Sequence, residues 1–198
     1  MDREEAKEIL RQAYTLYSSG EYEKAFPLFV QGAEAGFIPA YVMIGDCYWN
    51  GDGVDKDTTK AIQYYLASAE MENIDGMMRM GDVYLRCDEL QKAIDIYTKA
   101  AEKGAADALF NLGNLYYSGT DSMQRDLNIA AKYFEQYVDI VKDDADAFYL
   151  LGRCYVFMKE QNLPKAEKMF EISASLGNQQ AAKDLNALQL GGSIIDSY

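Results

Sequence analysis

The feature that most constrains the fold of this chain is a helical pattern repeated along nearly its whole length. Its first half consists of Ala or Gly, four residues, Gly, two residues and Tyr, with apolar residues four and one positions before the central Gly. These offsets share one face of a helix with 3.6 residues per turn. The four copies have their central glycines at Gly45, Gly81, Gly113 and Gly152.

A second pattern follows each copy of the first: Ala, an apolar residue at plus three, usually an aromatic residue at plus four, and mostly small residues at plus seven and plus eight. The five copies begin at Ala25, Ala61, Ala93, Ala130 and Ala166, and their aromatic residues are Phe29, Tyr65, Tyr97, Phe134 and Phe170. Spacings of 36, 32, 37 and 36 residues between copies are typical of a two-helix solenoid repeat. In the first repeat, Ala13 takes the place of the central glycine.

The pattern predicts an all-α chain that forms a single repeat domain over residues 1–198. The five helix pairs are expected at about 5–36, 37–73, 74–104, 105–143 and 144–177, followed by a capping helix at 178–190 and a flexible tail at 191–198. The cap is expected because each unit of a solenoid buries its apolar face only against its neighbours.

The central glycines lie in the middle of predicted helices, where each costs about 1 kcal/mol relative to alanine. Four such residues in the same register need a packing cause. We predict that a neighbouring group approaches the helix so closely at this position that a Cβ atom would clash.

The segment Ala40–Ala69 resembles a nearly complete unit of the Sel1-like repeats, relatives of the tetratricopeptide repeats. It carries the Gly51-x-Gly53-Val54 loop that lengthens the turn between the two helices, whereas the first and third repeats have shorter, tetratricopeptide-like turns. The resemblance covers about residues 5–181. It implies a right-handed α–α superhelix, whose concave face is lined by the first helix of each repeat, and a scaffold role in protein–protein assembly.

Composition excludes several other functions. The chain has no histidine, which removes Ser-His and Cys-His catalysis and imidazole metal sites. A formal net charge of −13 argues against nucleic acid and anionic membranes as partners. The start of the chain is charged and no apolar run is long enough to span a membrane. Cys47, Cys87 and Cys154 form no metal-binding or redox motif, so we expect reduced thiols and a cytoplasmic protein.

The loop Asn50–Asp57 is acidic and glycine-rich, which suggests calcium binding. An EF-hand register from Asn50 would need glycine at Asp55 and glutamate at Ala61. We therefore expect a turn in which Asp57 caps the second helix. No metal, cofactor or catalytic residue is predicted, and the chain is expected not to be an enzyme.

The expected binding site is the concave groove. Positions two before, one after and five after the central small residue share one face of the first helix, and four of the six arginines lie among these 15 positions. Arginine offers a planar fork for carboxylates, amides can bind a peptide backbone, and aromatic residues anchor many interfaces. We predict that another protein binds here through an extended or carboxylate-bearing segment, at Arg11, Tyr14, Asp46, Trp49, Arg79, Asp82, Arg86, Asn111, Asn114, Tyr117 and Arg153.

Three alternatives remain open. Arg79, Asp82 and Asp46 could simply pair along and between helices, which stabilises little at a surface. The chain could build homo-oligomers through its tyrosine-rich surface or its tail. A hydrolase acting on peptidoglycan or β-lactam substrates is attributed to some cysteine-rich relatives, but the absence of His and of a Ser-x-x-Lys motif counts against it.

Overall fold

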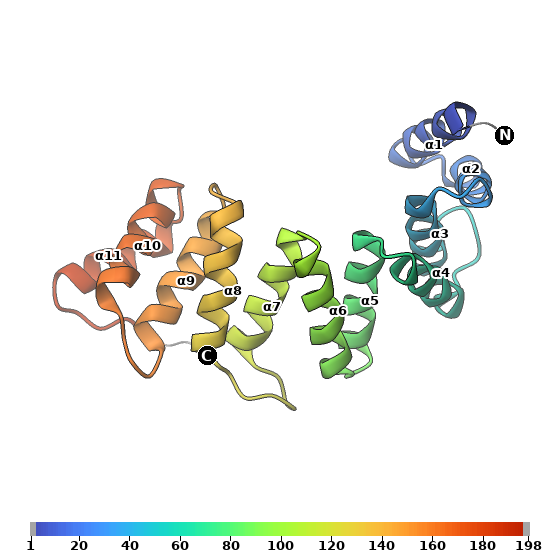
Figure 1. Cartoon of the computed structure of the whole chain (residues 1–198). Helices are drawn as coiled ribbons and strands as arrows, with labels where there is room; N and C mark the ends of the chain where they lie inside the picture. The colour runs from blue at the N-terminus through green and yellow to red at the C-terminus, as the bar shows by residue number, and fades with distance from the viewer. Residues whose placement is uncertain (1–2, 196–198) are drawn as a thin grey trace. The chain divides into compact units, whose positions relative to one another are not determined.

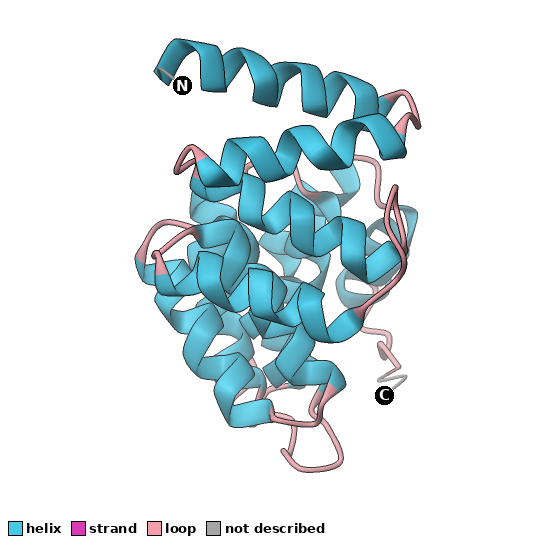
Figure 2. Ribbon diagram, turned by 90° about the vertical axis from the view of Figure 1, so that its right-hand side faces the viewer, coloured by secondary structure: helices cyan, strands magenta, loops and turns pink. Residues whose placement is uncertain are grey.

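The computed structural model describes residues 3–195, and every regular element in this range is an α-helix (Figures 1 and 2). Five helix pairs are followed by one further helix, which confirms the predicted all-α repeat fold. The helices are α1 (Arg3–Ser18), α2 (Tyr22–Glu34), α3 (Ile38–Asn50), α4 (Thr58–Glu70), α5 (Ile74–Arg86), α6 (Leu90–Glu102), α7 (Ala106–Ser118), α8 (Leu127–Ile140), α9 (Ala145–Phe157), α10 (Leu163–Ser175) and α11 (Gln179–Gln189).

The chain divides into two compact units. The first unit, Met1–Lys103, contains α1 to α6, and the second unit, Gly104–Tyr198, contains α7 to α11. Within each unit, helices that follow one another in the chain pack together, and α3 also contacts α5.

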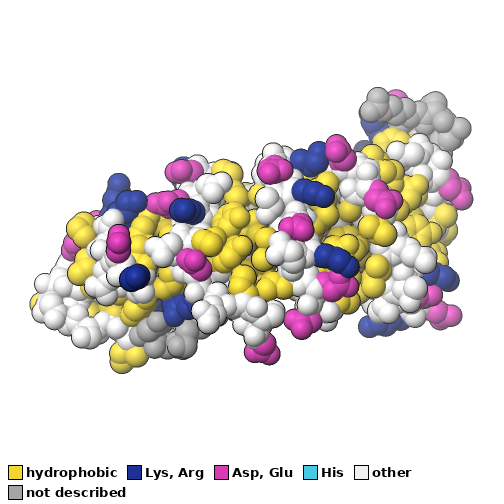
Figure 3. Space-filling model, turned by 60° about the horizontal axis from the view of Figure 1, so that its bottom comes forward, with side chains coloured by type: hydrophobic (Ala, Val, Ile, Leu, Met, Phe, Trp, Pro, Cys, Tyr) yellow, Lys and Arg dark blue, Asp and Glu magenta, His cyan; other side chains and the backbone are white. Residues whose placement is uncertain are grey.

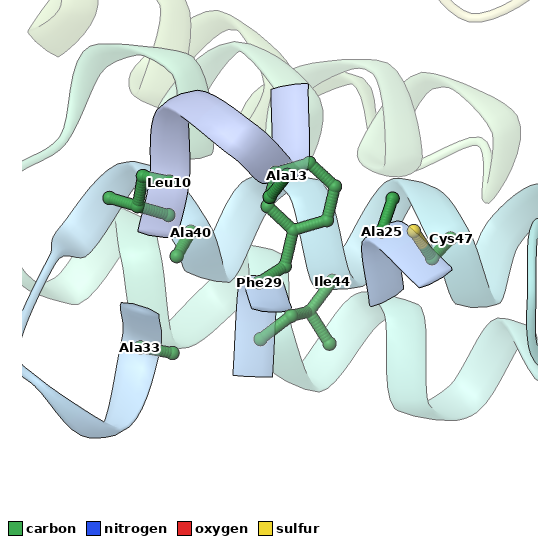
Figure 4. Packing of buried hydrophobic residues seen from close by; sticks show 8 residues of the cluster. All are labelled: Leu10, Ala13, Ala25, Phe29, Ala33, Ala40, Ile44 and Cys47. Carbon is green, nitrogen blue, oxygen red and sulfur yellow. The ribbon is translucent and has the colours of Figure 1, made fainter. Parts of the chain in front are cut away.

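The core of the first unit shows how the two repeated patterns meet. Figure 4 shows Phe29 of α2 with its ring at Ala13 of α1, while Ala40, Ile44 and Cys47 of α3 approach from the next repeat. Phe29 and Ala13 are fully buried. The apolar faces predicted for α1, α2 and α3 therefore form one core across the first two repeats.

The central glycines are explained by the aromatic residue of the second helix in the same repeat. A Cβ atom at Gly45 would lie 2.5 Å from Cε1 of the Tyr65 ring. The corresponding distances are 2.3 Å between Gly81 and Tyr97, 2.6 Å between Gly113 and Phe134, and 2.6 Å between Gly152 and Phe170. The predicted close approach is confirmed, and the approaching group is an aromatic ring that leaves no room for a Cβ atom.

The glycine loop of the second repeat packs against the first repeat. Gly53 has a φ of +71°, and a Cβ atom there would lie 2.2 Å from the carbonyl oxygen of Tyr22, so only glycine fits. The neighbouring Asp52 accepts a hydrogen bond of 2.7 Å from the hydroxyl of Tyr17. The predicted cap is also present, since the Asp57 side chain accepts from the backbone N–H of Lys60.

The second unit ends in α11, which occupies the place of the predicted capping helix. The side chain of Asn178, the residue before α11, caps the first turn of the helix, and Ala181 is fully buried. Asp184 accepts a hydrogen bond of 3.0 Å from the hydroxyl of Tyr149 on α9. The predicted flexible tail falls in part on residues 196–198, which lie outside the described residues.

Candidate functional site

A polar pocket in the first unit brings together five of the residues predicted to bind a partner. It has a volume of about 380 Å³ and is formed mainly by α3 and α5, the first helices of the second and third repeats. We call it the inner pocket; its lining residues are Tyr17, Asp46, Trp49, Asn50, Tyr65, Arg79, Asp82, Val83 and Arg86.

Both carboxylates of the inner pocket are held by tyrosines of the second helices. The hydroxyl of Tyr65 donates to Asp46 Oδ1 at 2.7 Å, and that of Tyr97 donates to Asp82 Oδ1 at 2.5 Å. Each ring lies on the glycine that precedes its aspartate, so its hydroxyl reaches the next residue of the same helix. Burial and the bond to Asp46 raise the pKa of Tyr65, which keeps the phenol protonated as a donor.

Asp46 also forms an ion pair between repeats. Nη2 of Arg79 lies 2.9 Å from Asp46 Oδ2, with side chains 46% and 15% exposed respectively. The alternative that Arg79 and Asp46 pair between helices is thus present in the structure. Asp82, in contrast, is held by Tyr97.

Arg86 is the arginine of the inner pocket whose charge is not balanced by an ion pair. Its guanidinium lies 5.4 Å from the centre of the Trp49 ring, in a cation–π arrangement. Arg86 is exposed, and no carboxylate among residues 3–195 lies within ion-pair distance of it. Trp49 is half-buried and tilted against Tyr65, with ring centres 6.3 Å apart. This side of the pocket offers a cationic fork beside an aromatic surface.

Arg11 and Tyr14 lie apart from the inner pocket, on a shallow surface of α1. Arg11 pairs with Glu8 at 2.6 Å, and both side chains are solvent-exposed. The Tyr14 ring packs edge-on against Phe29, with centres 5.3 Å apart. Burial, together with the nearby charges of Asp75 and Asp46, raises the pKa of Tyr14.

The predicted residues of the second unit differ in how accessible their side chains are. Asn111 and Asn114 are half-buried on α7, and in the part of the chain that the structure describes neither amide has a hydrogen-bond partner. Their side chains remain available to a peptide backbone.

Tyr117 and Arg153 correct the prediction that their side chains are open to a partner. Tyr117 is 1% exposed, because its ring packs against Phe134 and is covered by the guanidinium of Arg125, 5.1 Å from its centre. Arg153 is 7% exposed. It lies 5.2 Å from the centre of the Phe157 ring and donates to the backbone carbonyl of Ile195 at 3.4 Å.

Sequence reasoning missed three lining residues of the inner pocket: Tyr17, Tyr65 and Val83. A fourth, Asn50, lies five residues after Gly45 on the predicted face but was not among the residues predicted to bind a partner. One signal for Tyr65 was present. In the second and third repeats the aromatic residue of the second helix is tyrosine, and aspartate follows the central glycine of the first helix. The other repeats combine phenylalanine with Tyr, Asn or Arg at the position after the central small residue.

The cysteines behave as buried packing residues in two of three cases. Cys47 and Cys154 are buried, which raises the pKa of each thiol to about 12, while Cys87 is exposed. All three are free thiols. Within residues 3–195 no group of three or more His, Cys, Asp or Glu side chains could hold a metal ion. None of the helices in this range is long and apolar enough to cross a bilayer.

Stacked helix pairs with an aromatic ring on a central glycine define this chain as an α/α repeat protein of the tetratricopeptide-like class. The chain belongs to the Sel1 repeat family, whose model matches residues 38–73, 74–104, 106–136 and 145–178.

Known relatives support this membership. The "ERAD-associated E3 ubiquitin-protein ligase component HRD3" of Candida glabrata is 28% identical over 138 residues, which is 66% of this chain and 16% of that protein. The "DAP3-binding cell death enhancer 1" of Rattus norvegicus is 29% identical over 178 residues, 86% of this chain and 34% of that protein. The chain thus spans only 16% and 34% of the lengths of these two relatives. The crystal structure of a Sel1 repeat protein from Oxalobacter formigenes is 28% identical, with a TM-score of 0.74 over 92% of this chain and 78% of that one.

Proposed function

We propose that this chain is a non-enzymatic protein-interaction scaffold whose inner pocket binds an extended segment of a partner protein through a carboxylate. The family itself is one of repeat scaffolds. The names of two relatives, a ubiquitin-ligase component and a DAP3-binding protein, describe proteins that assemble with other proteins, which supports the general role.

The observation that carries the proposal is the state of Arg86. The two acidic groups of the inner pocket are already engaged, Asp46 by Tyr65 and Arg79 and Asp82 by Tyr97. Arg86 is held over Trp49 without an ion pair among the described residues. A planar guanidinium in this situation fits a carboxylate in a two-pronged arrangement, and the adjacent indole gives an apolar side chain a surface to pack on.

We extend the proposal to the compartment. Three free cysteines, two of them in the core, suit a reducing, cytoplasmic setting.

The test compares three forms of the chain as bait in a native lysate: the wild type, Arg86→Glu, and Lys99→Glu as a control. Lys99 is exposed on α6 and does not line the inner pocket, so the control matches the change in charge. The expected result is a partner retained by the wild type and Lys99→Glu but lost with Arg86→Glu. The same proteins on all three baits would contradict binding at the inner pocket.

A direct measurement then follows from the position of Trp49, which is the chain's single tryptophan. Peptides covering the captured partner are titrated into the protein while Trp49 emission is recorded. We expect one acidic peptide to change the emission saturably, and the same peptide with its carboxylates amidated to bind at least about 10-fold more weakly, corresponding to roughly 1.4 kcal/mol. Equal affinity for the two peptides would contradict the proposal that the inner pocket recognises a carboxylate of the partner.

A further inference from the structure

The second unit has a larger hollow that the proposed function does not use. It has a volume of about 750 Å³ and runs between α8 and α10, the second helices of the fourth and fifth repeats, with α9 at its floor. We call it the lysine groove, because Lys132, Lys142, Lys165 and Lys168 line it.

The floor of the lysine groove is apolar. Phe148 and Leu151 of α9 lie at its base and are buried, with 6% and 2% of their surface exposed. Met169 and Ile172 of α10 are half-buried and line the same space. The accessible apolar surface of the groove is therefore supplied mainly by Met169 and Ile172, above the buried Phe148 and Leu151.

One residue that shapes this groove departs from the repeat pattern. Val138 of α8 lines the groove, at the position where each of the other four repeats carries alanine. The residue before it, Tyr137, also replaces a small residue, and its hydroxyl donates to Asp144 at the start of α9 at 2.9 Å. The fourth repeat therefore presents bulky side chains where the others pack with small ones.

The polar rim is positive in a strongly acidic protein. Four lysines face Glu135 and Asp139 around the groove, which leaves a local formal charge of +2 against −13 for the whole chain. Lys165 pairs with Glu135 at 3.0 Å, and Lys142 pairs with Asp139 at 3.4 Å. Lys132 and Lys168 are exposed and have no carboxylate within ion-pair distance among residues 3–195.

On the face drawn in Figure 3, basic and acidic side chains are interspersed among apolar ones. At the lysine groove, Lys132 of α8 and Lys168 of α10, which have no ion pair among residues 3–195, border the apolar side chains of the groove.

We infer that the lysine groove binds an acidic amphipathic helix of a partner protein. An apolar floor between two parallel rims matches a helix that inserts one hydrophobic face. Lys132 and Lys168 then pair with carboxylates at the edges of that face. The net negative charge of the chain repels an acidic helix, whereas the lysines of the groove attract it. Electrostatics therefore favours binding of such a helix at the lysine groove over the rest of the surface.

The probe for this site is a fluorescein-labelled synthetic peptide of about 18 residues, long enough to populate a helix. It carries leucines at helical spacing on one face and glutamates elsewhere, and a matched peptide carries lysines instead of glutamates. Binding to the full chain is followed by fluorescence anisotropy. Because net charge would favour the lysine peptide, preferential saturable binding of the glutamate peptide is the expected result.

The variants compared are Lys132→Glu/Lys168→Glu and, with the same change in net charge, Lys99→Glu/Lys183→Glu. All four lysines are exposed. We expect the groove variant to bind the glutamate peptide at least about 10-fold more weakly, with the control within about 2-fold of the wild type. Circular dichroism and the Tm check that both variants are folded.

Several results would overturn the inference. The wild type could fail to bind the glutamate peptide, or both variants could weaken binding equally. Sedimentation velocity of the protein alone gives the third: a dimer abolished only by the groove variant would assign the groove to a second copy of this chain. Neither a failed nor a positive result here bears on the inner pocket, which is built from other residues in the first unit.

Discussion

The second and third repeats, in the first unit, use the same backbone packing as the fourth and fifth repeats, in the second unit, for different chemistry. In all four repeats an aromatic ring lies on the central glycine. In the first unit the ring is tyrosine and its hydroxyl holds the aspartate that follows the glycine. In the second unit the ring is phenylalanine, and the following residue is Asn114 or Arg153.

The comparison separates the packing of a repeat from its polar surface. The ring and the glycine fix how closely the two helices approach, and a single oxygen on the ring decides whether a carboxylate is anchored beside it. A second pair of equivalent positions makes the same point: Trp49 lines the inner pocket, whereas Tyr117 is buried beneath Arg125.

The largest expected effect is the protection of the two buried thiols, one in each unit. In a Cys87→Ser background, Cys47 and Cys154 should react with a thiol reagent at pH 8 at least about 10³-fold more slowly than in urea, because the unit that holds each must open first. The raised pKa of both thiols, about 12, slows them further. Mass spectrometry of labelled peptides measures each site separately.

This measurement also tests whether the units open independently. Equal opening free energies under all conditions would show that they unfold together. Fast labelling of either site in the native protein would contradict the burial of that cysteine.

The next effect compares the central glycines of the two units. Gly81→Ala places a Cβ atom 2.3 Å from the Tyr97 ring, which its bond to Asp82 prevents from moving away. We expect it to lower the stability of the first unit by about 2–3 kcal/mol. Gly113→Ala meets the untethered Phe134 ring, so the second unit should lose about 1 kcal/mol. The labelling rates of Cys47 and Cys154 measure the loss of stability in the first and second unit. A larger loss for Gly113→Ala than for Gly81→Ala would contradict the role of the bond between Tyr97 and Asp82.

A smaller effect is expected for Tyr65→Phe, which removes the hydroxyl bound to Asp46. The first unit should lose about 1–2 kcal/mol at pH 7, as for hydrogen bonds to charged groups. The folded state raises the pKa of Tyr65, so the unfolded phenol ionises first, near pH 10. Stability therefore falls as the pH rises above this value, and the variant should show less of that fall.

The control for this experiment is Tyr64→Phe. Tyr64 is the neighbouring tyrosine of α4, stacked on Tyr48, and among the described residues its hydroxyl has no hydrogen-bond partner. If the two variants lose stability equally, the hydroxyl of Tyr65 contributes nothing beyond its ring.

The smallest effect is expected for Arg79→Gln. Its ion pair with Asp46 is about half exposed on the arginine side, where such pairs contribute roughly 0–1 kcal/mol. We expect a loss of about 0.5 kcal/mol or less, reduced further by salt. A loss larger than that of Tyr65→Phe, measured by urea unfolding, would show that the ion pair rather than the phenol holds the carboxylate.

The helix pairs and the cause of the central glycines could be predicted from the sequence because they depend on local periodicity, which recurs five times. The inner pocket was predicted in part for the same reason: Asp46 and Asp82 follow the glycine on the expected face of the helix. The two tyrosines that hold them were not, because the pattern treats tyrosine and phenylalanine as equivalent rings.

The burial of Tyr117 and Arg153 could not be predicted, because it depends on segments outside the repeated helical patterns. Arg125 comes from the connection between α7 and α8, and Ile195 follows the last helix. Irregular segments of this kind carry no period, so the sequence does not indicate which groove positions they cover. The lysine groove was not predicted either, because the pattern of the second helices describes their buried residues and not the lysines on their exposed face.

The tyrosine–aspartate bond is made entirely within one repeat: Asp82 and Tyr97 lie 15 residues apart. The ion pair of Arg79, in contrast, spans two repeats and 33 residues. A designer who moves residues 74–104 into another array would thus transfer an anchored acidic group as a self-contained cassette. The ion pair would form only where the preceding repeat supplies an aspartate, so it depends on which repeats are neighbours. The tyrosine–aspartate bond does not depend on the neighbouring repeat.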